Sequence, residues 1–483
     1  MPTSKSSSPP TPSHEAAATT GLKDRHHRAE PIHAARTIGR AEPGRTCARP
    51  PSVQAGLKDT ATIKILIVGG GGREDALAWK IAQSPLVDAL FAAPGNPGIA
   101  RRARCVDIGV DAHGALVDFA RRERIDLVVV GPEAPLVAGL ADRFAEAGLA
   151  VFGPSQRAAA IEGSKAFSKD LMRRYAIPTA RFATFDDAAA ARRFCRELGA
   201  PLVVKADGLA AGKGAIVCPT LEDADAAIAE CMERRAFGAA GARVVVEEFM
   251  VGQEVSFFAL SNGADVMTLA AAEDHKAVFD GDRGPNTGGM GCYSPVPQFD
   301  EALEKRVVET IVRPTLGALA REGAPYRGVL YAGLMLTREG PKVVEFNCRF
   351  GDPECQALMV RVPGDLVPLL LAAARGDAWP PSRVWPSSAS VCVNLASGGY
   401  PGKYQTGLPI RDIEAAEARP GVNVFHAGTA TRDGRLVTAG GRVLGVTAVA
   451  EGIEAAIAAA YAAVGDISFE GMHYRTDIGR RRA

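Results

Sequence analysis

The chain has 483 residues, a formal net charge of +1 and 47% hydrophobic residues. This composition is that of an ordinary globular protein with room for about three domains. The near-neutral charge gives no electrostatic case for binding nucleic acid or a membrane surface. Nine cysteines without a CxxC pair argue against a zinc site and a disulfide framework, and favour a reducing, cytoplasmic compartment. No apolar run is long enough to span a membrane.

Residues 1–61 are rich in Ser, Pro, Ala, Arg and His and show no apolar periodicity. Such a segment cannot bury enough surface to offset chain entropy, so the sequence predicts a disordered tail. It lacks the apolar core of a signal peptide, and its acidic residues count against a mitochondrial presequence.

Three strands at the start of the ordered region each run into a loop rich in glycine or proline. The strand and loop pairs are 63–68 with 69–74, 89–92 with 94–98, and 126–130 with 131–135. Each loop alone could be a simple tight turn. Together, with helical segments between them and a helix from Asp75, they predict a doubly wound parallel sheet. Its loops would gather at the carboxyl edge of the sheet, where ligands bind. We expect this domain to span residues 62–163.

The next region, expected to span residues 164–377, begins with a helix that Ser164 can cap. Lys205 ends an apolar run, where a lysine either reaches the surface or points at a ligand anion. The glycine loop 206–214 can fold backbone amides over phosphates, although it is not a Walker loop. Two strands around a hinge are expected at 244–257. The charged, glycine-rich run 273–291 shows no periodicity, which predicts a long loop that is either functional or disordered.

The stretch 345–354 follows an apolar strand, 330–336, across a Gly-Pro turn, which predicts an antiparallel hairpin. Alternation along the second strand predicts a core face of Val344, Phe346 and Cys348. The opposite face then carries Glu345, Asn347 and Arg349. A carboxylate beside an amide oxygen suits Mg²⁺ when substrate phosphates complete the shell. Arg349 can fork onto an anion. The alternative is a half-exposed strand whose polar face merely meets water.

A helix is expected at 355–376, and a smaller domain at 388–483. The strands expected in that domain are 389–395, 422–425 and 442–446, followed by an alanine-rich helix at 451–464.

These segments resemble the ATP-grasp fold and, more closely, the phosphoribosylamine–glycine ligase (glycinamide ribonucleotide synthetase) family. The resemblance covers residue 63 to the C-terminus. It rests on GGGGRE at 69–74, DHK at 274–276, DGDRGPNTGGMG at 280–291 and RFGDPECQ at 349–356. One departure is Asp75, where many members have a histidine. An acid beside a phosphate loop weakens the electrostatics, although Asp75 could also cap the helix.

The resemblance implies an α/β architecture with three parts: an N-terminal doubly wound parallel-sheet domain, a central ATP-grasp domain and a small C-terminal α+β domain. It also implies the residues that bind each ligand. ATP would be bound by Lys165, Lys205, Gly208, Gly212, Lys213, Gly214, Glu247, Phe249 and Glu254. The metal, Mg²⁺ or Mn²⁺, would be held by Glu345 and Asn347, with Arg349 and Asp352 as catalytic residues. Substrate binding would fall to Gly70, Gly71, Gly72, Arg73, Glu74, Asn96, Glu133, Asp274, Lys276, Asn286, Thr287, Gly288 and Gly289.

The reaction implied by the resemblance joins glycine to 5-phosphoribosylamine. ATP would phosphorylate the glycine carboxylate, and the amine would then displace phosphate to give 5′-phosphoribosylglycinamide. The implied partners are small molecules, with neither nucleic acid nor a membrane, and the implied state is a monomer or weak homodimer. Two alternatives remain open at this point: another ATP-grasp carboxylate ligase, or a catalytically dead nucleotide-binding homologue.

Overall fold

The structure, a computed structural model, describes residues 62–210, 214–381 and 385–480. The predicted disordered tail lies outside the described residues, as do Gly212 and Lys213. No helix in these three ranges is long and apolar enough to cross a bilayer.

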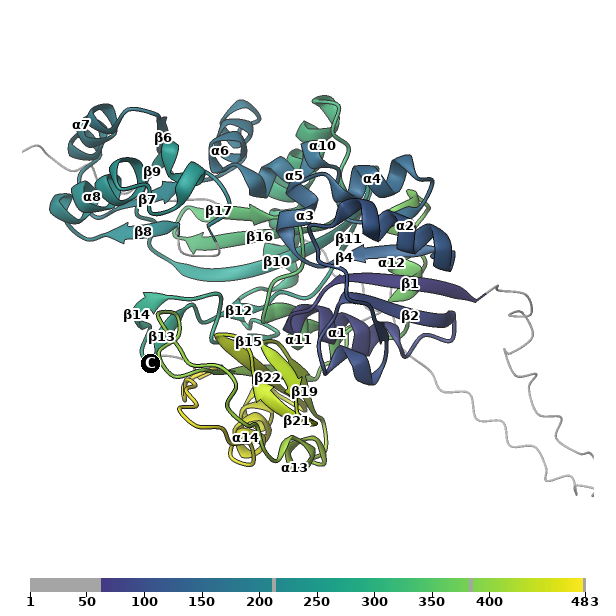
Figure 1. The fold of residues 1–483 in the computed structure, drawn as a ribbon. Coiled ribbons are helices and arrows are strands. Elements are labelled where there is room, and N and C mark those ends of the chain that lie inside the picture. Colours follow the sequence, from purple (N-terminus) through teal and green to yellow (C-terminus); the bar gives the residue numbers. More distant parts are fainter. Residues whose placement is uncertain (1–61, 211–213, 382–384, 481–483) are drawn as a thin grey trace, which may run out of the picture. The chain divides into compact units, whose positions relative to one another are not determined.

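A parallel five-stranded sheet follows the start of the described chain, with strand order β3-β2-β1-β4-β5 (Figure 1). The strands are β1 Ile63–Gly69, β2 Val87–Pro94, β3 Arg104–Cys105, β4 Leu127–Val130 and β5 Ala150–Phe152. The helices of this part are α1 Gly72–Ile81, α2 His113–Glu123, α3 Glu133–Val137, α4 Leu140–Glu146 and α5 Gln156–Gly163, with a short 3₁₀ turn at Ile99–Arg101. Ile65 and Ile67 of the central strand enter one apolar core, while Leu66 and Val68 enter another. Because both faces are covered, the strand is apolar throughout, and the predicted doubly wound sheet is confirmed.

Helix α1 begins three residues earlier than predicted. The side chain of Glu74 reaches back and accepts a hydrogen bond from the backbone N–H of Gly71 at 2.6 Å, which closes the first turn at Gly71. Asp75 therefore lies inside the helix and cannot cap it. Its carboxyl group is fully buried and accepts from the backbone N–H of His426 at 2.7 Å, with Arg102 3.6 Å away. Asp75 thus packs against the C-terminal part of the chain.

Two mixed α/β layers follow. The first sheet has the order β6-β9-β7-β8 and the second the order β11-β10-β16-β17 (Figure 1). Their strands are β6 Phe182–Phe185, β7 Leu202–Ala206, β8 Ala215–Cys218, β9 Val244–Glu248, β10 Gln253–Asn262, β11 Val266–Thr268, β16 Arg327–Thr337 and β17 Gly340–Asn347. Their helices are α6 Lys165–Arg174, α7 Ala188–Leu198, α8 Leu221–Ile228, α9 Glu301–Val307 and α10 Arg313–Arg321. Ser164 caps α6 as predicted, because its hydroxyl accepts from the N–H of Phe167 at 3.1 Å.

Strand β17 pairs antiparallel with β16, which confirms the predicted hairpin, but it carries a β-bulge. Gly333 pairs with Glu345 and the next residue, Leu334, pairs with Val343, so Val344 is left out of the ladder. The bulge turns Val343 toward the core, on the same side as Phe346 and Cys348. The predicted core position of Val344 is therefore wrong, because an unpaired residue shifts the alternation by one.

The C-terminal sheet has the order β12-β15-β18-β22-β19. It joins strands from two distant parts of the sequence: β12 Glu273–Asp274 and β15 Gly291–Ser294, then β18 Ala389–Ala396, β19 Val422–His426 and β22 Arg442–Ala450. Helix α14, Ile453–Val464, packs on β18 and β22. A short helix, α13 Ile413–Glu417, and a two-stranded pair, β20 Thr429–Arg432 and β21 Arg435–Thr438, complete this part.

The run 273–291 is thus not an irregular loop. Between β12 and β15 it forms a hairpin of β13, Ala277–Phe279, and β14, Arg283–Asn286. Strands of two to four residues are too short to show a period of two. The predicted helix 355–376 is also two helices, α11 Glu354–Met359 and α12 Val367–Arg375. The break contains Pro363 and Gly364, and the positive φ of Gly364, 68°, ends helical geometry there.

Candidate active site

Four lysines gather around three carboxylates on α6, β7, β9, β10, β17 and the turn after β12. We call this group the lysine cluster; it consists of Lys165, Lys169, Lys205, Lys276, Glu247, Glu254 and Glu345. Lys169 and Lys205 each place the ammonium nitrogen 3.0 Å from Oε2 of Glu247. Lys276 donates to Glu254.

Glu345 is the carboxylate whose pKa is affected by three of the four lysines. Burial raises its pKa, but Lys276, Lys205 and Lys165 outweigh burial and hold the pKa below its usual range. Lys165 donates to the carbonyl of Gly208 at 3.1 Å. Glu345 is therefore ionised at neutral pH, and its nearest cations keep N–H groups that a phosphate can use.

Lys205 is 4% exposed, which excludes the reading that its side chain reaches the surface. Besides Glu247, its ammonium donates to the carbonyl of Val344 at 3.0 Å. That carbonyl belongs to the bulged residue, so the bulge ties the lysine to the strand that carries Glu345.

A metal ion fits the polar face of β17. Asn347 Oδ1 accepts from Arg349 Nη2 at 3.1 Å, which fixes the amide, and one lone pair of Oδ1 stays available. Within the described ranges, no three His, Cys, Asp or Glu side chains form a metal-binding group. A single carboxylate with an amide oxygen is nevertheless the protein share of a Mg²⁺ shell that nucleotide phosphates complete, so Glu345 and Asn347 fit the ion.

Arginines dominate the neighbouring part of the site. We call this group the arginine cluster; it consists of Arg73, Arg349 and Arg442 with Glu74, Glu133, Glu162 and Asp352. Arg349 lies 3.2 Å from Glu133 and 3.1 Å from Glu162, and it also donates to the carbonyl of Phe350 at 3.3 Å. Its guanidinium is thus occupied by the protein.

The other two arginines hold the loop that follows β17. Arg73 lies 2.6 Å from Glu74 and donates to the carbonyl of Phe350 at 3.2 Å. Arg442 donates to the carbonyls of Gly288 and Asp352, and its Nη2 lies 3.4 Å from the Asp352 carboxylate. Burial raises the pKa of Asp352, but Arg442 and Arg73 hold it below the usual range.

The loops of the parallel sheet pack too closely for side chains at their glycines. A Cβ on Gly70 would lie 2.5 Å from the carbonyl of Gly95, so only glycine fits. Asn96 locks the two loops together, because its amide nitrogen donates to the carbonyls of Gly70 at 3.0 Å and His426 at 2.7 Å. A Cβ on Gly71 would lie 3.7 Å from the Asp352 carboxylate, so the loop at Gly70 and Gly71 borders the arginine cluster.

The loop after β14 closes this part of the site. Gly289 has a φ of +112°, and a Cβ there would lie 2.7 Å from Oδ1 of Asp274. Thr287 donates from its hydroxyl to the carbonyl of Lys276, and Tyr400 accepts from the N–H of Gly288 at 3.1 Å. Oδ1 of Asp274 is buried and has no hydrogen-bond partner among the described residues. Burial and the charge of Glu354 raise the pKa of Asp274 well above its usual value.

Two other predicted residues are exposed to solvent. Phe249 is 40% exposed in the hinge between β9 and β10, and Asn286 is exposed on β14. A cavity of about 570 Å³ lies between β8 and β14. It is lined by Ala215, Ile216, Val217, Gly284, Pro285, Asn286, Pro401 and Gly402. Gly214 adjoins β8, and a Cβ there would meet Ala210.

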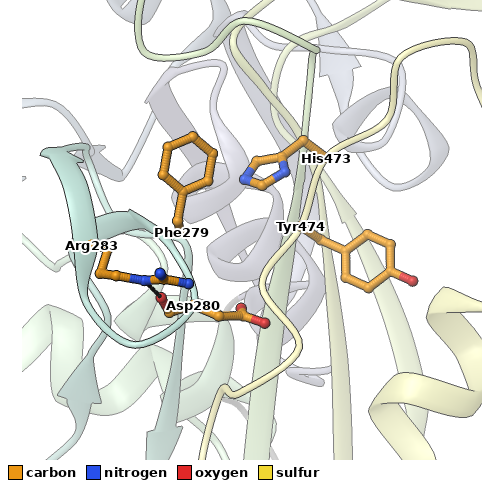
Figure 2. Close-up of a pocket in the computed structure, with 5 residues that line it drawn as sticks. All are labelled: Phe279, Asp280, Arg283, His473 and Tyr474. Carbon is orange, nitrogen blue, oxygen red and sulfur yellow. Dashed lines mark hydrogen bonds between the residues drawn. The ribbon is translucent and has the colours of Figure 1, made fainter.

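A second cavity, of about 430 Å³, contains none of the predicted site residues. Figure 2 shows the rings of Phe279 and His473 near one another, and Arg283 donating to the carbonyl of Asp280. The two ring centroids are 5.6 Å apart, and Tyr474 completes the lining.

Three charged residues of the two clusters escaped sequence reasoning: Lys169, Glu162 and Arg442. Lys169 follows Lys165 by four residues, which places both on one face of a helix, so this spacing was a usable signal. Glu162 and Arg442 stand far from Arg349 and Asp352 in sequence and belong to no motif.

The two sheets hold between them lysines, a glycine loop and a strand that carries a carboxylate and an amide. This arrangement defines an ATP-grasp protein. The chain belongs to the phosphoribosylglycinamide synthetase family. Models of that family's N domain, ATP-grasp (A) domain and C domain match residues 63–162, 163–355 and 390–481. The resemblance inferred from the sequence is confirmed.

Two curated relatives match this chain over almost all of their own length. The chain is 54% identical over 419 residues to the phosphoribosylamine–glycine ligase of Rhizobium meliloti, and 51% identical over 423 residues to that of Salmonella typhimurium. Each alignment covers 87% of this chain and 98% of the relative.

Solved structures agree with the fold. The crystal structure of phosphoribosylamine–glycine ligase from Thermotoga maritima matches with a TM-score of 0.76 at 33% identity, over 86% of this chain and all of that one. A biotin carboxylase domain from Hydrogenobacter thermophilus, solved with MgADP and bicarbonate, covers 86% of this chain and 92% of its own length. It matches with a TM-score of 0.67 at 17% identity, a likeness of fold alone.

Proposed function

We propose that this chain is an ATP-dependent ligase that joins glycine to 5-phosphoribosylamine, forming 5′-phosphoribosylglycinamide, ADP and phosphate. The proposal is carried by the lysine cluster around Glu345, in a chain that matches full-length phosphoribosylamine–glycine ligases over 98% of their length. The same observations disfavour a catalytically dead homologue, because Lys165, Lys205, Glu345 and Asn347 are all present and oriented.

In the first step, a carboxylate oxygen of glycine attacks the γ-phosphorus of ATP and ADP leaves. The protein contributes position and charge, as in other phosphoryl transfers. Lys165 and Lys205 face the phosphates, and Gly208 and Gly214 of the glycine loop adjoin them; Gly212 and Lys213 are assigned to the same phosphates from the sequence alone. Glu247, Phe249 and Glu254 hold the adenine and ribose. Mg²⁺ or Mn²⁺ bound to Glu345 and Asn347 would neutralise charge on the phosphates.

In the second step, the amine of 5-phosphoribosylamine attacks the carbonyl carbon of glycyl phosphate. The new C–N bond replaces the C–O bond to phosphate, which leaves with the electron pair, and the amine loses a proton. We assign the substrates to the arginine cluster and its loops, where Asp352 is ionised and the glycine loop at Gly70 and Gly71 leads into the N-terminus of α1, an end of a helix that favours an anion. Arg349 would act mainly by holding Asn347 and the loop in place.

The test is a coupled assay of ADP release with glycine and freshly prepared 5-phosphoribosylamine. ADP release should require both substrates, and the product should carry the glycine carbons. Release with bicarbonate but not glycine would instead show another ATP-grasp carboxylate ligase. No release with any carboxylate, in a protein that still binds ATP, would show a non-catalytic nucleotide-binding homologue.

A further inference from the structure

Lys169 is a buried lysine of α6 that lies one turn after Lys165 and is only 2% exposed. Its ammonium donates to the hydroxyl of Thr179 at 2.7 Å and lies 3.0 Å from Oε2 of Glu247. Thr179 in turn donates to the carbonyl of Val343 in β17 at 2.7 Å. Burying an ammonium is costly unless it is paired, so its place deep in the lysine cluster needs a reason.

Glu247 divides its two oxygens between the protein and an open position. Oε2 is shared by the ammonium groups of Lys169 and Lys205. Oε1 is buried and has no hydrogen-bond partner among the described residues. Lys205 also donates to the carbonyl of Val344, the residue before Glu345. One network therefore joins Lys169, Glu247 and Lys205 to the strand proposed to hold the metal.

The charge on Lys169 decides how Glu247 interacts with Lys205. When Lys169 is charged, Glu247 is attracted to both lysines, and the three groups carry one net positive charge. When Lys169 is neutral, Glu247 and Lys205 form a neutral pair, which attracts an anion less.

The charged groups that face Lys169 are Glu247 and Glu248 of β9 and Lys205 of β7. The ring of Phe182 in β6 lies 5.5 Å away, and β17 offers only its backbone through Thr179. Burial lowers the pKa of Lys169 to about 8. The charge of Lys205 acts in the same direction, and the charge of Glu247 opposes both. Its charge therefore changes within a range of pH that the protein can be tested in.

We propose that Lys169 is a positioning residue whose positive charge holds Glu247 and leaves Lys205 available to the phosphates, so that the charge state of Lys169 sets the affinity for ATP. The inference rests on the proposed function, because it takes ATP as the ligand of the lysine cluster.

The experiment measures the Kd of a non-hydrolysable ATP analogue with Mg²⁺ by calorimetry from pH 7 to pH 9.5. Wild-type affinity should fall by about tenfold as Lys169 loses its proton. Lys169→Arg, which stays charged, should bind with little change over this range. Lys169→Gln keeps hydrogen-bonding groups without charge, and should bind about tenfold more weakly at pH 7 and then stay constant. Lys305→Gln alters a lysine side chain that is 75% exposed and should follow the wild type.

Ionisation of the nucleotide itself is common to all variants, so the differences between their profiles carry the result. Equal weakening of wild type and Lys169→Arg at high pH would overturn the proposal, as would wild-type affinity in Lys169→Gln at pH 7. If the larger arginine prevents folding, as seen by near-ultraviolet circular dichroism, the wild-type profile against the flat profile of Lys169→Gln decides the matter.

Lys205→Met separates this inference from the proposed function. If Lys205→Met weakens ATP binding while both Lys169 variants leave it unchanged, the inference alone fails. If Lys205→Met also binds ATP normally, then ATP is not bound by the lysine cluster, and the proposed nucleotide site fails with it.

Discussion

The lysine cluster and the arginine cluster meet at the end of β17, where Arg349 donates to Asn347, and they are built in different ways. In the lysine cluster, ammonium groups outnumber carboxylates, and two of their contacts are to backbone carbonyls, those of Gly208 and Val344. In the arginine cluster, each guanidinium is matched by a protein carboxylate: Arg73 by Glu74, Arg349 by Glu133 and Glu162, and Arg442 by Asp352. The first has positive charge to offer a ligand. In the second, protein carboxylates pair with the positive charge, and the arginines hold loops in place.

Removing the charge of Arg349 should break this comparison most severely. Arg349→Met leaves Glu162, 8% exposed at its side chain, and Glu133 without their cation. Loss of one partner of a buried ion pair costs about 3 to 5 kcal/mol, so the midpoint of urea unfolding should fall by a corresponding amount. Arg313→Met is the control: its side chain is 56% exposed beside Asp265, and the expected loss is below about 1 kcal/mol. Normal stability in Arg349→Met would contradict the structural role of the cluster.

Asn347 lies where the two clusters meet, and its loss should affect turnover rather than folding. Asn347→Leu removes the metal-facing oxygen, and kcat should fall by about 10² to 10³ while the melting temperature changes little. Phe346→Ala, on the core face of the same strand, should cost about 3 to 5 kcal/mol of stability, and the folded fraction should still turn over. The reverse pattern would show that β17 is read in the wrong register.

Asp75 sharpens the comparison, because it is a buried carboxylate outside both clusters. Burial raises its pKa to about 6, against the backbone hydrogen bond from His426 and the charge of Arg102. The folded protein therefore holds a proton that the unfolded chain releases near pH 4, so the contribution of Asp75 to stability falls as pH rises from about 4 to 6. Asp75→Asn does not titrate. Its stability relative to wild type should grow between pH 4 and pH 7 by about 3 kcal/mol at most.

Urea unfolding of both proteins at several pH values measures this difference. His275 and His426, with pKa values lowered to about 4 mainly by burial, titrate in both proteins and cancel. A difference that is constant with pH would mean that Asp75 is ionised in the folded state down to its usual pKa.

The smallest expected effect concerns one hydrogen bond at the Gly288 loop. Tyr400→Phe removes the acceptor of the Gly288 N–H, a neutral bond worth about 1 kcal/mol. We expect kcat/KM for 5-phosphoribosylamine to fall by less than about tenfold, with ATP binding unchanged. An effect on ATP of the same size would mean that this loop serves the nucleotide instead.

The sequence alone predicted the parallel sheet, the hairpin and the family, because each rests on a local pattern. The side chains of Ile63–Gly69 alternate between two apolar cores. The long charged motifs at 280–291 and 349–356 are specific to the family. The bulge at Val344 left no trace in the sequence, since an unpaired residue looks like any other in a strand. Glu162 and Arg442 meet Arg349 and Asp352 only in three dimensions. The assigned roles of single site residues remain predictions that the variants above test.

The C-terminal sheet has a consequence for how the molecule comes apart. Strand β15 pairs with β18, and Asn394 of β18 donates to the carbonyl of Gly289. The loop at Gly288 and Gly289 is therefore hydrogen-bonded to a strand more than a hundred residues further along the chain. A cut after Arg375 should yield two fragments that stay associated through this shared sheet. Neither fragment would then behave as an independent domain when fused to another protein.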